Sequence, residues 1–155
     1  MLRHAAILLL SLGVASLATP ADSPPAPSGA ARALALNVND PGLKWGPCPP
    51  LFAPGCQIAV LQGDPAQPHS DVFFRIPAGY TIAAHSHTSA EHMVLVTGEL
   101  EVRYQGQEPV VLKQGNYAYG PAKVPHAGRC LSATPCTLFI AFELAVDAHA
   151  HAGSL

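Results

Sequence analysis

The sequence is poor in charged residues and lacks the patterns of long helices. Asp, Glu, Lys and Arg make up 12% of its 155 residues, about half of the quarter that is usual in soluble proteins. The formal net charge is −2, so the chain has no basic field to attract nucleic acid or anionic membranes. Heptads are absent, which excludes a coiled coil. Hydrophobic residues still make up 49%, so these absences leave a globular domain rather than a disordered chain.

Several common functional motifs are also missing. The chain has no G-x-S-x-G elbow, no phosphate-binding P-loop and no G-x-G-x-x-G fingerprint, so the usual serine hydrolase and nucleotide-binding signatures are absent. None of its four cysteines is spaced as C-x-x-C, which excludes a zinc ribbon. Histidine is abundant instead: eight His equal the eight Lys plus Arg.

The first residues predict a secretory signal peptide. Arg3 supplies a positive charge, an uncharged apolar run follows over 5–18, and Ser16 and Ala18 are small residues at the −3 and −1 positions of a cleavage site. An uncleaved anchor or an amphipathic helix is the alternative, although a spanning helix needs about 20 apolar residues. We therefore expect residues 1–18 to be removed and the protein to be secreted or periplasmic, without a membrane anchor.

The remaining chain predicts one folded domain with flexible ends. Residues 19–33 are rich in Pro and Ala and carry no large apolar side chain. They therefore cannot bury enough surface to fold, and we expect them to form a linker. The domain is expected over 34–146. Residues 147–155 are small and polar and predict a flexible tail.

The domain is expected to be all-β. Within 99–104, Leu100, Val102 and Tyr104 alternate with charged residues, the period of a half-buried strand. Turn signals separate this segment from other short runs of β-branched and aromatic residues. The expected strands are 57–62, 71–76, two within 93–104 around Gly98, 110–112, 116–119 and 137–144. Such spacing is typical of a sandwich or a jelly-roll barrel.

Four residues form a candidate metal site. His85 and His87 alternate along an extended segment, so both imidazoles project from one face. Glu91 follows closely enough for a turn to bring its carboxylate beside them, and His126 lies 35 residues further on. Three imidazoles and a carboxylate can hold a divalent transition metal and leave coordination positions open for chemistry. A His-x-His pair alone is more often a surface or core feature.

The glycines around these residues indicate a known family. Gly79, five residues, His85, one, His87, three, Glu91, six and Gly98 together resemble the first sequence motif of the cupin superfamily, with every spacing kept.

A second motif of the same superfamily matches more loosely. Gly115 is followed after five residues by Pro121 and then by His126 five positions later. Lys123 stands where this motif commonly has Gly, and Cys130 stands where it commonly has Asn. Ligation is unaffected by these departures, but Lys adopts a positive φ less easily than Gly.

The resemblance is to a small single-domain exported bacterial cupin. It implies a jelly-roll β-barrel, or double-stranded β-helix, with a metal ligated by His85, His87, Glu91 and His126. The donor set suits Zn, Cu, Fe, Ni or Mn. If the chain is exported unfolded, the site meets metal ions outside the cytosol. The order of affinities of divalent metals then favours Cu and Zn over Mn and Fe. Barrels of this kind often pair through edge strands, so a homodimer is an expectation of the resemblance.

Other histidines are weaker candidates. His92 neighbours Glu91, but adjacent strand residues point to opposite faces, so we expect it to face outward or to lie behind the ligands. His149 and His151 repeat the His-x-His spacing within the expected tail, without glycines or a third ligand.

The cysteines form two local pairs, and an exported protein meets an oxidising compartment. Three connectivities are possible. We favour Cys48–Cys56 and Cys130–Cys136, because each pair brackets a turn. The alternative is that Cys130, four residues after His126, is a thiolate ligand.

Aromatic and basic side chains are candidates for the pocket lining. Tyr117 and Tyr119 share one strand face, and Tyr104 and Arg75 are further candidates. Two functions stay open. One is a metal-dependent enzyme with dioxygenase- or isomerase-like chemistry on a small organic molecule, in which Glu91 leaves the metal to act as a base. The other is a non-catalytic, metal-dependent binder of a small ligand.

Overall fold

The computed structural model describes residues 33–155, and residues 35–155 form one compact unit. The predicted signal peptide and residues 19–32 of the predicted linker lie outside the described residues. Every regular element in the described part is a strand, so no helix there has the length and hydrophobicity to cross a membrane.

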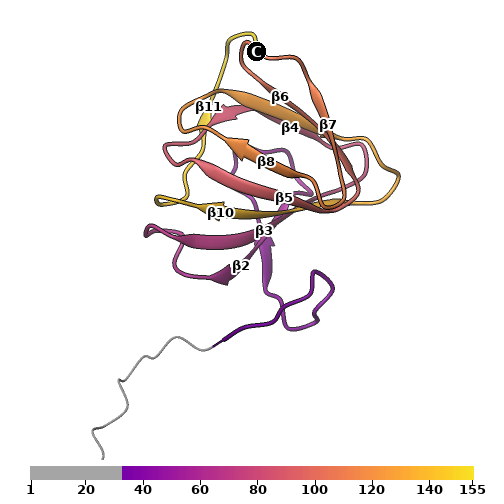
Figure 1. The fold of residues 1–155 in the computed structure, drawn as a ribbon, viewed down its shortest axis with the longest axis vertical. Coiled ribbons are helices and arrows are strands. Elements are labelled where there is room, and N and C mark those ends of the chain that lie inside the picture. Colours follow the sequence, from indigo (N-terminus) through magenta and orange to yellow (C-terminus); the bar gives the residue numbers. More distant parts are fainter. Residues whose placement is uncertain (1–32) are drawn as a thin grey trace, which may run out of the picture. The chain divides into compact units, whose positions relative to one another are not determined.

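In this part of the chain, eleven strands form two antiparallel sheets (Figure 1). The first sheet has the order β1 (Trp45–Pro47), β2 (Gln57–Gln62), β3 (Ser70–Ile76), β10 (Cys136–Phe142), β5 (Glu91–Thr97) and β8 (Tyr117–Gly120). The second has the order β11 (His149–Ala150), β4 (Thr81–Ser86), β9 (His126–Cys130), β6 (Glu99–Tyr104) and β7 (Val110–Lys113). This arrangement confirms the predicted all-β, jelly-roll architecture.

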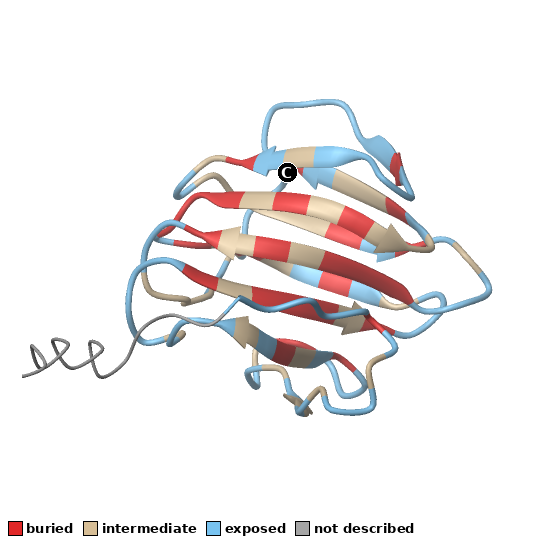
Figure 2. Ribbon diagram, turned by 60° about the horizontal axis from the view of Figure 1, so that its bottom comes forward, coloured by how far each residue is buried: buried red, intermediate tan, exposed pale blue. Residues whose placement is uncertain are grey.

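The main core lies between the sheets. Leu95 on β5 and Leu100 on β6 have no exposed surface, and Ile76 on β3 has 1%. Buried and less buried residues alternate along β5, as its colouring shows in Figure 2. The alternation follows from the two-residue period of strand side chains. It places one face of each sheet in the core and so positions the side chains of the site.

A smaller core covers the outer face of the first sheet. Phe73 on β3 is buried there, and its ring lies 6.4 Å from that of Trp45 in a stacked arrangement. The Arg75 guanidinium lies 3.7 Å from the Trp45 ring centroid and donates a 2.9 Å hydrogen bond to the Val38 carbonyl. Arg75 therefore holds the segment before β1 and does not line the cavity, which corrects the prediction. The reason is alternation, because its neighbours Phe74 and Ile76 face the main core.

Both local cysteine pairs are disulfide-bonded, Cys48 to Cys56 and Cys130 to Cys136. Cys130 is therefore not the thiolate ligand that the sequence left as an alternative. Two disulfides are compatible with a location outside the cytosol.

The chain end differs from the predicted flexible tail. β11 pairs with β4, with His149 opposite Ser86 and Ala150 opposite His85. The His151 amide continues this contact by donating to the Ala84 carbonyl at 3.0 Å. Backbone hydrogen bonds to the free edge of β4 order the segment, and its small polar side chains gave no signal of that pairing.

Candidate metal centre

Three imidazoles meet at one end of the space between the sheets. His85 lies on β4, His87 directly follows that strand, and His126 begins β9 opposite His85. The ring centroids of His85 and His126 are 4.3 Å apart, and those of His85 and His87 are 4.7 Å apart. One donor atom from each of the three lies within 4.8 Å of the other two. The structure thus brings together the three predicted histidines, and together they can hold a metal ion.

A backbone carbonyl orients each ring. Nδ1 of His85 donates to the Ala83 carbonyl at 2.7 Å, and Nδ1 of His126 donates to the Val124 carbonyl at 3.1 Å. Nδ1 of His87 donates to the carbonyl of Asp147. A carbonyl oxygen only accepts, so each Nδ1 carries the proton and each Nε2 keeps its lone pair. This is the usual second-layer arrangement of metal-ligating histidines.

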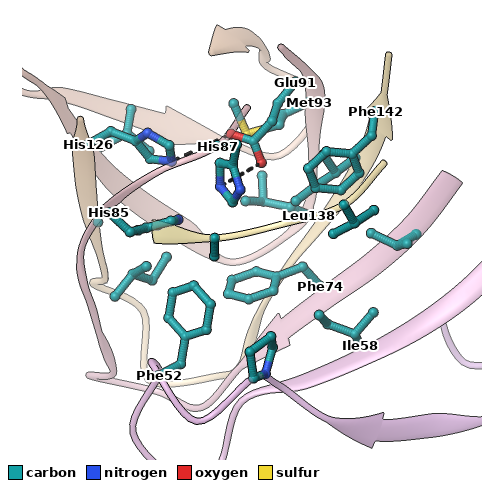
Figure 3. Close-up of a pocket in the computed structure, with 18 of the residues that line it drawn as sticks. Phe52, Ile58, Phe74, His85, His87, Glu91, Met93, His126, Leu138 and Phe142 are labelled. Carbon is teal, nitrogen blue, oxygen red and sulfur yellow. Dashed lines mark ion pairs between the residues drawn. The ribbon is translucent and has the colours of Figure 1, made fainter. Parts of the chain in front are cut away.

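Glu91, the first residue of β5, places its carboxylate beside two of the imidazoles. Oε1 lies 3.4 Å from Nε2 of His87, and Oε2 lies 3.5 Å from Nε2 of His126 (Figure 3). Two donors that each bind the same metal ion at about 2.1 Å lie no more than about 4.2 Å apart. The observed separations therefore fit a shared metal ion, although the set of donors that all lie close together consists of the three imidazoles only.

Burial sets the charge of these groups. It lowers the pKa of His85 to about 3 and that of His126 to about 4, with nearby imidazoles adding to the effect. The pKa of His87 is also lowered by burial. Burial raises the pKa of Glu91 to about 8. The imidazoles are thus neutral at pH 7, as metal ligands must be, and a bound cation would supply the charge that an ionised Glu91 needs.

The turn before His126 has an unusual residue. Lys123 adopts φ +65°, the left-handed conformation that the glycine usual at this position takes without strain. Its amide donates to the His87 carbonyl at 2.7 Å. The turn geometry of the second motif is therefore kept despite the lysine, and it links the chain before His126 to that of His87.

A cavity of about 290 Å³ opens from the imidazoles between the sheets. Its walls are mainly apolar, with Phe52, Phe74 and Phe142 among the side chains in Figure 3. Its polar lining is concentrated at the end formed by the imidazoles and Glu91. Among the described residues that line it, none is Lys or Arg.

Of the three tyrosines predicted to line the pocket, one lines the cavity and two do not. Tyr104 lines the cavity and is 9% exposed, and its hydroxyl has no hydrogen-bond partner among the described residues. Tyr117 and Tyr119 are 59% and 48% exposed and do not line it. They face outward because Ala118 between them packs against the main core. A four-residue strand does not reveal from sequence which of its faces is buried.

His92 lies beside these two tyrosines on the outer face. Its Nδ1 hydrogen-bonds the Tyr117 hydroxyl at 2.8 Å, and its Nε2 hydrogen-bonds Glu143 at 3.0 Å. The outward direction expected for His92 is therefore observed, and its ring does not compete with Glu91.

Two residues of the site were not predicted. Phe52 packs edge-on against the His85 ring with centroids 4.9 Å apart. It lies in the loop closed by Cys48 and Cys56, so the disulfide was the only available signal. Asp147 holds His87 through its backbone, and a backbone acceptor has no side-chain signature in a sequence.

Comparisons with known proteins agree on the fold. A family model described as a cupin domain matches residues 72–142. No curated protein matches the sequence. Similar solved structures include Rru_A2000 from Rhodospirillum rubrum, described as a cupin-2 domain, with a TM-score of 0.62, 13% identity and coverage of 77% of this chain and 82% of that one.

Two further solved structures are similar in fold. The DMSP lyase DddQ from Ruegeria pomeroyi DSS-3 has a TM-score of 0.60 and 21% identity, with 72% of this chain and 64% of that chain covered. KdgF from Halomonas sp. has a TM-score of 0.54 and 20% identity, with 64% and 87% covered. This chain thus spans less than two thirds of the lyase, and at these identities the likeness concerns the fold alone.

Proposed function

The chain belongs to the cupin superfamily, and from this premise we propose that it is an exported metal-dependent enzyme acting on a small organic molecule. In this proposal His85, His87, Glu91 and His126 ligate a divalent transition metal. The observation that supports it is that one donor nitrogen from each of three imidazoles lies within 4.8 Å of the other two, with each Nδ1 hydrogen-bonded to a carbonyl, at the end of an apolar cavity.

In this proposal the imidazoles, the cavity walls and Glu91 have different roles. A bound divalent metal would supply Lewis acidity, or redox chemistry with dioxygen, at its open positions. The three imidazoles hold it, and the apolar walls exclude water from the ligand. Glu91 lies 3.4 Å from Nε2 of His87 and 3.5 Å from Nε2 of His126, so its carboxylate, once it leaves the metal, is the candidate base.

The cavity limits the ligand. Its volume of about 290 Å³ is at the lower end for small-molecule sites. Its apolar walls favour an apolar body, and its polar end favours an oxygen group placed at the metal. Because no Lys or Arg is among its described lining residues, a highly charged ligand is disfavoured. Enzymes exist on this architecture, since one similar structure is a DMSP lyase, but its substrate is not transferred to this chain.

Metal loading and turnover test the proposal. The full chain is freed of metal, reloaded with Zn, Cu, Fe, Ni or Mn, and assayed against catechol-, flavonol- and diketone-type compounds. We expect near-stoichiometric metal by elemental analysis and turnover with at least one metal. His85→Ala should lose both. The control is His92→Ala, which removes an imidazole from the outer face and should leave metal content unchanged.

A non-catalytic binder is the second candidate. One observation favours it: apart from the proposed ligands, the titratable groups among the described lining residues are Tyr104 and Asp147, which form no evident acid–base pair. In this case the metal-loaded chain would bind members of the panel without turnover, and metal would still raise the melting temperature.

The same proposal includes export from the cytosol and formation of a homodimer. The apolar run over 5–18 and the two disulfides support a secreted or periplasmic protein. Cell fractionation with thiol labelling should find the chain outside the cytosol with all four cysteines blocked. A homodimer is expected by family resemblance, and sedimentation equilibrium measures it.

A further inference from the structure

The segment that follows β10 reaches across to the metal end of the second sheet. We call residues 146–151 the C-terminal strap. The Val146 amide donates to the Pro65 carbonyl at 2.8 Å, and the His151 amide donates to the Ala84 carbonyl at 3.0 Å. Between these two anchors, β11 lies along the edge of β4 (Figure 1). In this pairing Ala150 lies opposite His85.

The strap contacts the metal centre through Asp147. Its carbonyl accepts the Nδ1 proton of His87. Its carboxylate is fixed in turn, because Oδ1 accepts the Thr88 amide at 2.8 Å and Oδ2 lies 3.1 Å from Nε2 of His149. Asp147 thus contacts residues 87–88 through both its backbone carbonyl and its side-chain carboxylate.

His87 differs in this respect from the other two imidazoles. His85 and His126 donate to carbonyls two residues earlier in their own segments, so those rings are oriented locally. His87 donates to a residue 60 positions away in the sequence. Its ring orientation therefore depends on whether the strap is docked.

The strap is also a wall of the cavity. Val146, Asp147 and Ala148 all line it. Undocking would therefore open the cavity and remove the carbonyl that orients His87 in the same step.

We infer that the C-terminal strap is a positioning element that couples metal binding to closure of the cavity, with Asp147 as its positioning residue. This inference rests on the metal site of the proposed function. When the strap is docked, His87 presents Nε2 to the metal. When it is undocked, the ring can turn about its side-chain torsions and the site loses a fixed donor. By linkage, metal binding stabilises docking by the same factor by which docking strengthens metal binding.

Shortening the chain tests the strap directly. The metal affinity of the full chain is measured by competition with a chromophoric Zn²⁺ chelator and compared with that of a chain ending at Ala145. We expect a loss of about 10–100-fold, the range typical when a partner behind a metal ligand is removed. The control chain ends at His151, keeps the strap and should bind Zn²⁺ like the full chain.

A point variant covers the case in which the short chain fails to fold. Asp147→Ala removes the acceptor of the Thr88 amide and should weaken Zn²⁺ binding about three- to tenfold, since a hydrogen bond to a charged group is lost. Asp147→Asn keeps an acceptor oxygen and should restore affinity to within about twofold. A role in general stability alone would lower the melting temperature of the metal-free Ala variant without changing Zn²⁺ affinity.

Hydrogen exchange measures the reverse direction. Zn²⁺ should slow exchange of the Val146 and His151 amides in the full chain, and it should not do so in His85→Ala. Unchanged affinity in the folded short chain and in Asp147→Ala, or exchange at these amides that ignores Zn²⁺, overturns the inference while leaving the metal site standing. A full chain that binds no metal overturns the site itself, and the coupling with it.

Discussion

Glu91 is 4% exposed beside neutral imidazoles, and burial raises its pKa to about 8. In the metal-free protein the folded state therefore keeps the proton over a range in which the unfolded chain, where the carboxyl has its ordinary pKa of 4.5, has released it. The stability that the neutral carboxyl gives is complete below about pH 4.5 and is lost as the pH rises towards 8.

Glu91→Gln removes this dependence, since an amide does not ionise. In the presence of EDTA at pH 8, we expect the variant to unfold at higher urea than the wild type, by about 2–4 kcal/mol in unfolding free energy. At pH 4.5 the two should be similar. The lowered histidine pKa values act in both proteins and cancel in the comparison. Urea curves that keep a constant separation from pH 4.5 to 8 would contradict the assignment.

Tyr104 carries a buried hydroxyl group whose hydrogen bonding affects stability. Its ring is 9% exposed, and its hydroxyl has no partner in the described part of the chain. A buried, unsatisfied hydroxyl costs about 1–3 kcal/mol. Tyr104→Phe should therefore raise the unfolding free energy of the metal-free protein by about 1 kcal/mol, as measured by urea denaturation. Tyr119→Phe, on the exposed outer face, is the control and should change it little. A destabilised Tyr104→Phe would show that the hydroxyl has a partner in solution.

At the scale of elements, the turn from β5 to β6 packs against the Cys130–Cys136 disulfide. A Cβ added at Gly98 would lie 2.8 Å from the Cys136 sulfur and 3.1 Å from its Cα, and the residue has φ +87°. Gly98→Ala should therefore destabilise the protein by about 3 kcal/mol or more, through overpacking and backbone strain together. Gly106→Ala is the matched control, because it has a similar φ of +73° but no described atom within 4 Å of the added Cβ. The difference between the two thermal midpoints isolates the packing contribution.

Local sequence patterns predicted one of the strands and the side chains that converge at the site. The alternation of Leu100, Val102 and Tyr104 predicted β6, and the spacing of His85, His87 and Glu91 predicted which side chains converge. These signals are local, because each depends on residues within one strand or turn.

What the sequence did not predict depends on distant partners. β11 has two residues and exists because the edge of β4 offers it hydrogen bonds, and β1 exists by pairing with β2. The outward direction of Tyr117 depends on which face of β8 meets the core. Such features follow from the assembled barrel, so a linear pattern carries too little information to predict them.

At the scale of the described unit, the residues of the metal centre come from both sheets and from the strap. His85 and His126 belong to the second sheet, Glu91 belongs to the first, and Asp147 lies between β10 and β11. His85, His87 and Glu91 are close in the sequence, but His126 lies 35 positions after Glu91 and Glu91 belongs to the other sheet, so the full set of donors comes together only when these parts are assembled. The site therefore reports on the fold as a whole, and binding of an ion to it should stabilise the whole barrel.

Because the ion binds the folded state, the rise in melting temperature that it causes can be predicted. A ligand that binds only the folded state at a free concentration 100 times its dissociation constant adds about 2.7 kcal/mol, which corresponds to about 10 °C in melting temperature for a domain of this size. We expect Zn²⁺ to raise the melting temperature of the metal-free full chain by that amount and EDTA to reverse it. His85→Ala should show little shift, whereas His92→Ala should respond like the wild type because its ring faces outward. Since the disulfides remain closed in both conditions, a shift that persisted in His85→Ala would place the ion elsewhere, and His149 with Asp147, 3.1 Å apart at the surface, would be the next pair to substitute.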